Sequence, residues 1–294
     1  MTELTIVIVN YNATDYLDQC LESVARETRR CSYRIVVIDN ASTDQDTAIL
    51  KRNHPEIDLL CNQRNLGFAT ACNQGIRRRP ASYYLLLNPD SLILDGAIDQ
   101  SLELLRSRSD VGIVGCRVLN PDGTLQLASR RSIPRLSTAL YRLLRLSLLF
   151  PRSKVLARYN LTFLDEDSVH EVEAVSGSFL MFRAALLEGD GFLDESFFLY
   201  GEDLDFCYRA LQKGWNVIYY PEAKITHFKG RSSHRSRKSL YHYYEAMGIF
   251  YRKHYGAQSS PLKNALVLAG IRLLYWSALL RTVITGRRDV GSPY

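Results

Sequence analysis

The sequence lacks several features that would mark particular classes of protein. Its six cysteines are scattered and none forms a C-x-x-C pair, which argues against a zinc ribbon or a disulfide framework and fits a reducing cytosol. No G-x-G-x-x-G follows the first predicted strand and no G-x-x-x-x-G-K-[ST] occurs anywhere, so a dinucleotide oxidoreductase and a P-loop phosphotransferase are disfavoured. The N-terminus has neither a basic nor a long apolar stretch, and we expect no signal peptide.

Composition and charge are those of a folded protein with an uneven electrostatic profile. The 294 residues are 46% apolar and 23% charged, enough for one large domain or two small ones. From Lys224 onward, 13 Lys and Arg face two acids, a net of +11, which leaves −5 of the total +6 for residues 1–223. A basic tail suggests an anionic partner: nucleic acid, a phosphorylated substrate or an anionic membrane. No nucleic-acid recognition motif is present, so we expect no nucleic-acid partner.

The first half of the chain alternates between short apolar runs and segments with helical spacing. This alternation predicts a parallel sheet covered by helices on both faces. The predicted strands are Thr5–Val9, Arg34–Ile38, Ile57–Cys61, Tyr83–Leu87 and Val111–Val114, and the predicted helices are Tyr16–Thr28, Thr47–Arg52, Ala69–Arg78 and Ala97–Arg106.

Small polar residues follow four of these strands. In parallel sheets ligands bind at the carboxyl ends of the strands, so these residues are candidates for a common site. The alternative is that Asn, Asp, Gly and Ser simply favour turns. The four loops are Asn10–Asn12, Asp39–Ser42, Asn62–Gly67 and Asn88–Asp90.

The second half is less regular. Asn120–Thr124 is a strong turn signal, and Gly177-Ser178 separates two predicted strands, Val172–Ser176 and Phe179–Phe182. A predicted helix, Leu204–Lys213, ends at Gly214, and a further strand covers Asn216–Tyr220.

Seven motifs follow one another along the chain: VIVNYN (7–12), VIDNAS (37–42), NLGFATACNQG (65–75), LLLNPD (85–90), SGSFLMFR (176–183), GFLDESFFLYGEDLDFCYR (191–209) and ITH (225–227). In this order they make the chain similar to a family 2 glycosyltransferase of the GT-A fold. The NPD form and the GEDLDFCYR block most resemble its rhamnosyltransferase-like branch. The resemblance implies an α/β Rossmann-like, mostly parallel sheet with helices on both faces and a helical C-terminal extension. It implies a nucleotide-sugar half (1–115), an acceptor and catalytic half (116–230) and a basic C-terminal region (231–294).

A donor of this family carries its sugar on a nucleoside diphosphate, whose departure favours a divalent cation. The family usually has D-x-D where this chain has Asn88-Pro89-Asp90, so Asp90 must supply the carboxylate, with a turn cap as its alternative role. By resemblance His227 completes the metal site, which leaves Mg²⁺ or Mn²⁺ open. The residues expected around the nucleotide sugar are Val9, Tyr11, Asn12, Asp39, Arg64, Gly67, Asn88 and Asp90.

An inverting transfer needs a base that takes the proton of the acceptor hydroxyl. By resemblance Asp203 is this base, at or beside the cap of the helix that begins at Leu204; the alternative is that Asp203 is only the cap. Glu202 and Asp205 are the other candidate bases, and Glu202 is alternatively a contact to acceptor hydroxyls. Arg209, Lys229 and Arg231 are candidate contacts to the acceptor or a diphosphate; Arg209 could instead orient the acids or be structural.

Two segments suit a membrane surface. Arg135–Phe150 has the pattern of a basic amphipathic helix. Leu262–Ile284 is long enough to span a bilayer, but Lys263, Arg272 and Arg281 interrupt it, so we do not expect a simple transmembrane helix. A core or oligomer-forming helix, in a homodimer for example, is the alternative.

These observations together predict an inverting, metal-dependent glycosyltransferase on the inner face of the cell membrane. The favoured donor is dTDP-rhamnose, with a UDP-hexose as the alternative. The expected acceptor is a saccharide on a polyprenyl diphosphate or a growing glycan. A catalytically inactive sugar-nucleotide-binding subunit is the non-enzyme alternative.

Overall fold

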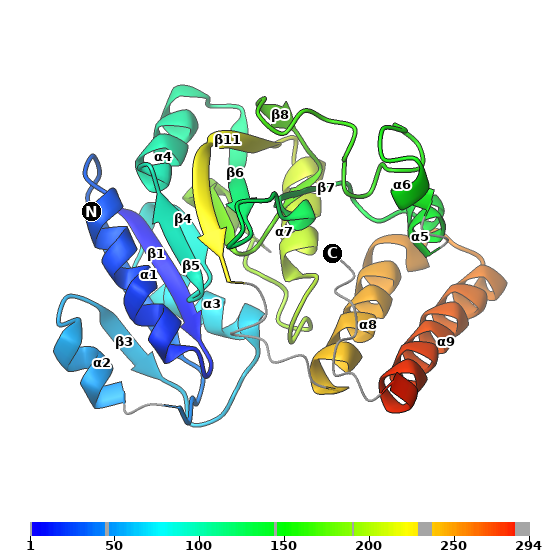
Figure 1. Ribbon diagram of the computed structural model, residues 1–294, viewed down its shortest axis with the longest axis horizontal. Coiled ribbons are helices and arrows are strands. Elements are labelled where there is room, and N and C mark those ends of the chain that lie inside the picture. The colour runs from blue at the N-terminus through cyan, green and yellow to red at the C-terminus, as the bar shows by residue number, and fades with distance from the viewer. Residues whose placement is uncertain (1, 45–46, 144–145, 190, 229–236, 286–294) are drawn as a thin grey trace.

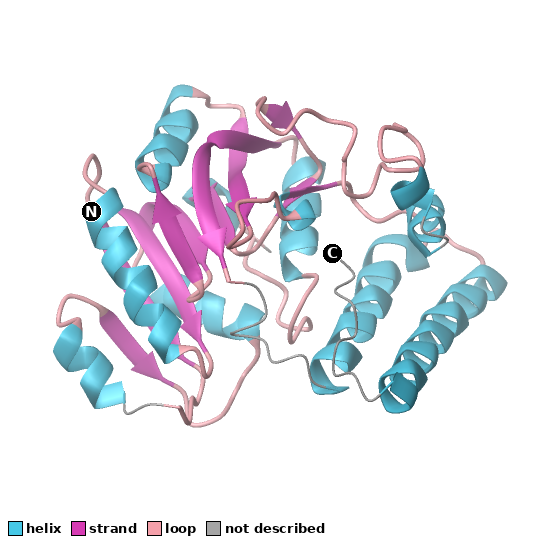
Figure 2. Cartoon of the chain, viewed as in Figure 1, coloured by secondary structure: helices cyan, strands magenta, loops and turns pink. Residues whose placement is uncertain are grey.

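The protein is built around one large, mixed β-sheet with helices on both of its faces. The computed structural model describes residues 2–44, 47–143, 146–189, 191–228 and 237–285 (Figures 1 and 2). The strands of the large sheet are β1 (Thr2–Asn10), β2 (Tyr33–Asp39), β3 (Asp58–Cys61), β4 (Ala81–Leu87), β5 (Ser91–Leu94), β6 (Val111–Leu119), β8 (His170–Glu171), β10 (Phe179–Arg183) and β11 (Asn216–His227).

The strand order in the sheet is β3-β2-β1-β4-β10-β6-β11-β5, and β8 pairs with β11. Strands β1 to β4 are parallel, as the alternating sequence predicts, with Val9 beside Ile38 and Ile6 beside Leu85. Strand β10 is inserted antiparallel between β4 and β6. Strand β5 was not predicted; it closes the far edge antiparallel to β11. The mostly parallel α/β sheet is therefore confirmed.

Two apolar cores fill the two faces of the sheet, because alternate strand residues point to opposite sides. On one face Ile6 and Ile8 pack with α1 (Thr14–Glu27) and α4 (Ala97–Ser107). On the other face Val7 and Val9 pack with α3 (Phe68–Arg78), α7 (Glu202–Gln212) and α8 (Arg237–Tyr251). A shorter helix, α2 (Thr47–Asn53), contributes Leu50 to the first core. The helices thus cover both faces, as expected.

The second half differs from the prediction in its details. Only Ala174–Val175 of the predicted strand 172–176 is a strand, β9, which pairs with β7 (Arg130–Arg131) in a separate small sheet. Two short helical turns, η1 (Leu127–Ser129) and η2 (Ala184–Leu187), were not predicted. The Asn120–Thr124 turn is present, closed by a hydrogen bond from Asn120 N to Thr124 O.

The amphipathic segment predicted at 135–150 contains two short helices. They are α5 (Leu136–Leu143) and α6 (Leu146–Leu149), and residues 144–145 lie outside the described part of the chain. Leu148, Leu149 and Phe150 are exposed at the end of this segment.

The C-terminal region is a pair of helices, of which α8 packs against the core on the α7 side of the sheet. Helix α8 continues into a π-helical turn, η3 (Arg252–Gly256), and then α9 (Pro261–Thr285) runs back along α8 (Figure 1). Ala246 and Phe250 of α8 belong to the main core, so α8 is packed into the α/β unit rather than standing apart from it. Helix α9 is long and apolar enough to cross a membrane by length and composition, and none of its most apolar stretch is buried.

Candidate functional site

The carboxyl ends of β1 and β2 meet in a buried polar cluster. Asp39 is 3% exposed, and its Oδ1 accepts a hydrogen bond from Asn10 Nδ2 at 3.0 Å. Its Oδ2 accepts one from the backbone N of Ser42 at 3.0 Å. The same Asn10 amide lies 3.2 Å from Ser42 Oγ. The predicted nucleotide residue Asp39 is therefore fixed at the expected sheet edge, with its carboxylate held by neighbouring loops.

A second cluster joins the loops after β2 and β3. Asn40 Nδ2 donates to Asn65 Oδ1 at 2.9 Å, and Asn40 Oδ1 accepts from Asn62 Nδ2 at 3.0 Å and from the N of Leu66 at 3.1 Å. This side chain holds the loop that leads into α3. The side-chain amides of Asn40, Asn62 and Asn65 therefore form hydrogen bonds within the protein's own loops.

Gly67 lies where this loop meets the backbone at Phe198, and only glycine fits there. Its φ is +89°, and a Cβ there would lie 2.7 Å from the carbonyl oxygen of Phe198. The next residue, Phe68, donates its backbone N to that oxygen at 2.8 Å. Glycine is needed both for the left-handed conformation and for the close approach. Gly67 thus joins the two halves of the site.

The other predicted nucleotide residues line the same edge. Tyr11 is 38% exposed, whereas Val9 is buried behind it. Asn12 adopts a φ of 54° and accepts a hydrogen bond from the N of Thr43 at 2.7 Å through its Oδ1. Arg64 is exposed in the loop after β3 and makes no hydrogen bond or ion pair with the described residues, so its guanidinium is open to an anion.

Asp90 and His227 come together although 137 positions separate them in the chain. Asp90 Oδ1 lies 3.1 Å from His227 Nε2, and both residues are buried. The amide Nδ2 of Asn88 lies 3.2 Å from the same imidazole nitrogen. Gln126 holds the other side of the ring: its Nε2 donates to the carbonyl of His227 at 2.8 Å and its Oε1 lies 3.0 Å from Nδ1.

The hydrogen bonds of Gln126 determine which ring nitrogen of His227 carries the hydrogen. Because the Gln126 amide donates to a carbonyl, its oxygen faces Nδ1, and Nδ1 must carry the hydrogen. In the neutral ring the lone pair of Nε2 then faces the Asn88 amide at 3.2 Å and the Asp90 carboxylate at 3.1 Å. An imidazole nitrogen and a carboxylate oxygen side by side are both ligands that a divalent metal ion accepts, so this donor set fits such an ion. Among the described residues no three His, Cys, Asp or Glu side chains are placed so that together they could hold a metal ion, so such an ion would complete its shell from substrate oxygens and water.

One short segment connects this pair to the predicted base. The carbonyl of Ser178 accepts a hydrogen bond from the N of Asn88 at 3.1 Å. The N of Gly177 donates to Asp203 Oδ2 at 3.0 Å. Adjacent residues therefore contact the Asn88–Asp90 loop and Asp203.

Three donors converge on the carboxylate of Asp203. Besides Gly177, Arg131 Nη2 lies 2.5 Å from Oδ2, and the N of Leu204 donates to Oδ1 at 2.7 Å. Helix α7 begins at Glu202 with Gly201 as its N-cap, so Asp203 lies in the first turn. The prediction that Asp203 stands at or beside the cap of a helix starting at Leu204 is wrong by two residues. The donors leave the carboxylate only partly exposed.

The environment of Glu202 differs from that of Asp203. It is 6% exposed, and its Oε2 has no hydrogen-bond partner among the described residues. Burial raises the pKa of the Glu202 carboxyl to about 8, and the neighbouring charge of Asp203 adds to the shift. Glu202 therefore holds a proton near neutral pH, which suits a hydrogen-bond donor better than a base.

Arg209 lies beside the site and contacts the next acid of the motif. Its Nε donates to Asp205 Oδ2 at 2.8 Å and its Nη2 donates to the carbonyl of Phe192 at 2.8 Å. Its predicted contact with an acceptor or diphosphate stays a prediction. Lys229 and Arg231, the other two residues of that prediction, lie outside the described residues.

Sequence reasoning missed Arg131 and Gln126. Arg131 belongs to a two-residue strand and Gln126 lies in the loop before η1, so neither has a periodic pattern or a motif around it. The only signal is indirect, because buried arginine and glutamine side chains need partners.

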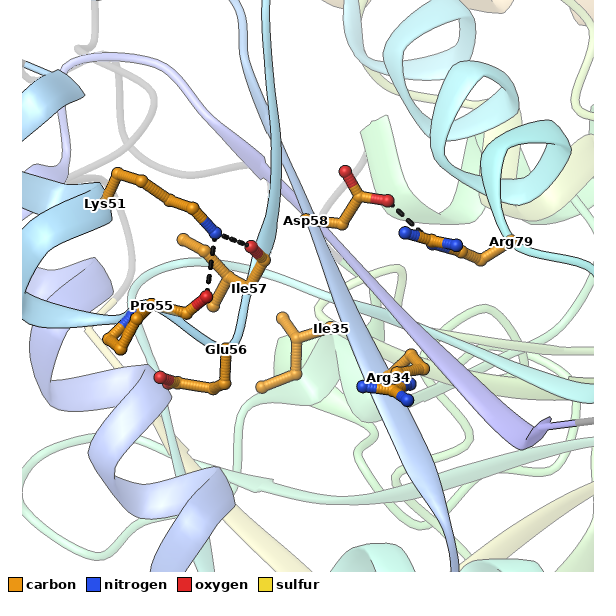
Figure 3. A pocket seen from close by; sticks show the side chains of 8 residues that line it. All are labelled: Arg34, Ile35, Lys51, Pro55, Glu56, Ile57, Asp58 and Arg79. Atoms are coloured by element: carbon orange, nitrogen blue, oxygen red, sulfur yellow. Dashed lines mark hydrogen bonds and ion pairs between the residues drawn. The ribbon is translucent and has the colours of Figure 1, made fainter.

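A surface pocket lies away from this edge, near the start of β2 and β3 (Figure 3). Two of its three basic side chains are engaged by the protein itself: Lys51 Nζ bonds the carbonyls of Pro55 and Ile57, and Arg79 Nε donates to Asp58 at 2.7 Å. The polar clusters described above lie instead at the carboxyl ends of the strands. We therefore assign the candidate site to the carboxyl edge of the sheet.

The raised pKa of Glu202 predicts a pH-dependent stability. The folded pKa of about 8 exceeds the ordinary value of 4.5, so this residue favours folding fully below pH 4.5 and loses that contribution as the pH rises toward 8. The Glu202→Gln variant should lack this loss. Chemical unfolding of both proteins between pH 5 and 8 should give a stability difference that grows in favour of the variant; a constant difference would contradict the assigned environment.

Solved structures share this fold. The crystal structure of Staphylococcus aureus TarS 1–349 aligns with 92% of this chain and 70% of its own, with a TM-score of 0.55 at 14% identity. TarS 1–349 in complex with UDP gives a TM-score of 0.54 at 15% identity over 94% of this chain and 72% of that one. GalNAc-T7 with UDP, GalNAc and Mn²⁺ gives 0.59 at 15% identity over 94% of this chain and 54% of that one. At these identities the likeness establishes the GT-A-like fold.

Sequence relatives are more specific. The chain is 28% identical over 276 residues to the N-acetylglucosaminyl-diphospho-decaprenol L-rhamnosyltransferase of Mycobacterium tuberculosis, covering 90% of this chain and 89% of the relative. It is 24% identical over 250 residues to the rhamnosyltransferase WbbL of Escherichia coli K12, covering 80% and 86%. The family model "Glycosyltransferase like family 2" matches residues 2–241. With the site geometry described above, this match establishes that the chain belongs to glycosyltransferase family 2.

Proposed function

We propose that this protein is an inverting, metal-dependent rhamnosyltransferase that uses dTDP-rhamnose and a saccharide carried on a polyprenyl diphosphate. The observation that carries the proposal is the junction at Gly177 and Ser178. This dipeptide bonds the Asn88–Asp90 loop through one backbone group and the carboxylate of Asp203 through the other. A leaving diphosphate and an attacking hydroxyl therefore have separate partners a short distance apart.

The proposed chemistry is a single displacement. Asp203 takes the proton of the acceptor hydroxyl, and the acceptor oxygen attacks the anomeric carbon from the face opposite the diphosphate, which inverts the configuration. Arg131 and Gly177 hold the carboxylate in place through its Oδ2. Glu202, which is protonated near neutral pH, is suited to donate a hydrogen bond rather than to accept the proton.

Asp90 and His227 would hold the divalent ion, with Asn88 beside them. The ion's chemistry there is to neutralise charge on the departing diphosphate. Gln126 fixes the imidazole so that Nε2 faces the site. Arg64, which pairs with none of the described residues, adds a positive charge at the same sheet edge.

Donor and acceptor classes rest on the relatives. The M. tuberculosis relative is named for L-rhamnose transfer to a decaprenyl-diphosphate-linked sugar, and WbbL is named a rhamnosyltransferase. A UDP-hexose donor is the alternative, because a structural neighbour was solved with UDP. The inactive-subunit alternative is disfavoured because Asp90, His227 and Asp203 are all retained.

The exposed face of α9 supports a place at the membrane surface. Its apolar side chains recur at helical spacing along one outer side, and Lys263, Arg272 and Arg281 are exposed among them. Exposed apolar and basic side chains together favour contact with an anionic bilayer. The exposure also argues against a core helix. The exposed apolar residues are Leu262, Leu266, Leu273, Trp276, Leu280, Val283 and Ile284.

The base assignment predicts a turnover defect without a binding defect. Asp203→Asn should lower rhamnosyl transfer roughly 10²–10⁴-fold while dTDP-rhamnose binding changes little. Asp110→Asn, at a surface ion pair with Arg108, is the matched control and should keep full turnover. Near-normal transfer by Asp203→Asn would reject the assignment, and a panel of dTDP- and UDP-sugars in the same assay tests the donor.

The metal assignment predicts a loss of activity on chelation. Excess EDTA should abolish transfer, and added Mg²⁺ or Mn²⁺ should restore it. Asp90→Ala should raise the metal concentration needed for half-maximal donor binding, measured by calorimetry, because the buried carboxylate ligand is gone. Full activity in excess EDTA would reject the metal role.

The membrane assignment predicts two components of vesicle binding. The intact protein should float with anionic phosphatidylglycerol vesicles, and salt should weaken this binding without abolishing it, because apolar burial is not screened. Leu266→Glu, Leu273→Glu and Leu280→Glu combined should reduce flotation and transfer to a lipid-linked acceptor, but not donor hydrolysis. A homodimer that ignores vesicles, detected by sedimentation, would assign the face to subunit contact instead.

A further inference from the structure

The acid two residues after the proposed base is held by the C-terminal helical pair. Asp205 is fully buried, and its Oδ1 lies 2.7 Å from His254 Nε2 and 2.8 Å from Lys253 Nζ. Its Oδ2 accepts the hydrogen bond from Arg209. Burial alone would raise the pKa of the Asp205 carboxyl, but the His254 hydrogen bond and the charges of Arg209 and Lys253 outweigh it and lower the pKa to about 2.

Lys253 and His254 come from the π-helical turn between α8 and α9. Such turns are uncommon and occur often at functional sites. The His254 ring is fixed by Tyr208 and Phe250, each with its ring centroid 4.6 Å away. Lys253 also reaches Asp194 Oδ2 at 2.5 Å, in the loop that precedes α7. The turn therefore contacts both α7, through Asp205, and the loop before α7, through Asp194.

The contacts of Lys253 and His254 are made to the first turn of α7. Its N-cap, Gly201, has no side chain that could cap the helix, and its φ is +85°. Positions 203 and 205 lie on opposite sides of a helix, since two residues rotate by about 200°. Asp203 is held from one side by Arg131 and Gly177, and Asp205 is held from the other by Lys253 and His254.

We propose that Asp205, His254 and Lys253 are positioning residues: they fix the first turn of α7 and thereby aim the carboxylate of Asp203 at the acceptor hydroxyl. This inference rests on the proposed role of Asp203 as base. The inference gives the C-terminal helical pair a part in catalysis. The turn that joins α8 to α9 would set the position of the base, and α9 also carries the exposed apolar face.

We call Asp205, Lys253 and His254 the clamp. The test uses the full-length enzyme and compares variants of the clamp. His254→Leu removes the hydrogen bond, His254→Gln keeps an N–H donor, and Lys253→Met removes the charge at a partly exposed position. Asp194→Asn removes the other partner of Lys253 and is the matched control. Transfer kcat, donor KM and donor hydrolysis are measured for each variant, with thermal unfolding to verify the fold.

We expect His254→Leu to lower transfer kcat about 10- to 100-fold, the scale of a misplaced catalytic group, with donor KM within about twofold. His254→Gln should recover most of this loss, Lys253→Met should show a smaller fall in kcat, and Asp194→Asn should be near normal. Unchanged kcat in both His254→Leu and Lys253→Met would overturn the proposal.

The decisive comparison is made in a protein that lacks the base. In an Asp203→Asn background, His254→Leu should cause no further loss of transfer, because there is no base left to aim. An equal loss with and without Asp203 would reduce the clamp to a structural role and overturn the inference. Near-normal transfer by Asp203→Asn alone would instead reject the base assignment, which keeps the two failures apart.

Discussion

The site depends on one constraint of the sheet, the insertion of β10 antiparallel between β4 and β6. A parallel strand would bring its carboxyl end to the ligand edge, but β10 brings its amino end and the Ser176–Ser178 turn that precedes it. Backbone groups of this turn then bond the loop after β4 and the first turn of α7. The loop after β4 and the first turn of α7 do not bond each other directly in this junction. The turn before the antiparallel strand β10 bonds both of them and so fixes their relative positions.

The two acids that flank Asp203 illustrate how a fold separates similar groups. Glu202 and Asp205 are both buried on the first turn of α7, yet the pKa of one is raised to about 8 and that of the other is lowered to about 2. The difference comes from partners: Asp205 is contacted by three basic side chains, whereas Glu202 Oε2 has no partner among the described residues. Environment, rather than residue type, decides which acid is charged.

The sequence predicted the part of the site that follows from periodicity and strand order. Asn10 and Asp39 meet because parallel strands must end at one edge, and Asp90 and His227 meet as the family resemblance implies. The direction of β10 was not predictable, because a short apolar run looks the same in either direction. Arg131, Gln126 and His254 were also missed. Their partners lie 72, 101 and 49 positions away, and no local pattern encodes such contacts.

The outer stripe of α9 has a geometric consequence for how an acceptor is met. A helix whose apolar side chains stay on one side can lie flat, which fixes the height and tilt of the enzyme but leaves it free to turn about the bilayer normal. With the proposed membrane placement, enzyme and lipid-linked acceptor would share a surface, and their encounters would follow lateral diffusion in two dimensions. On such a surface the rate would depend on the number of acceptors per unit of membrane area rather than on their bulk concentration.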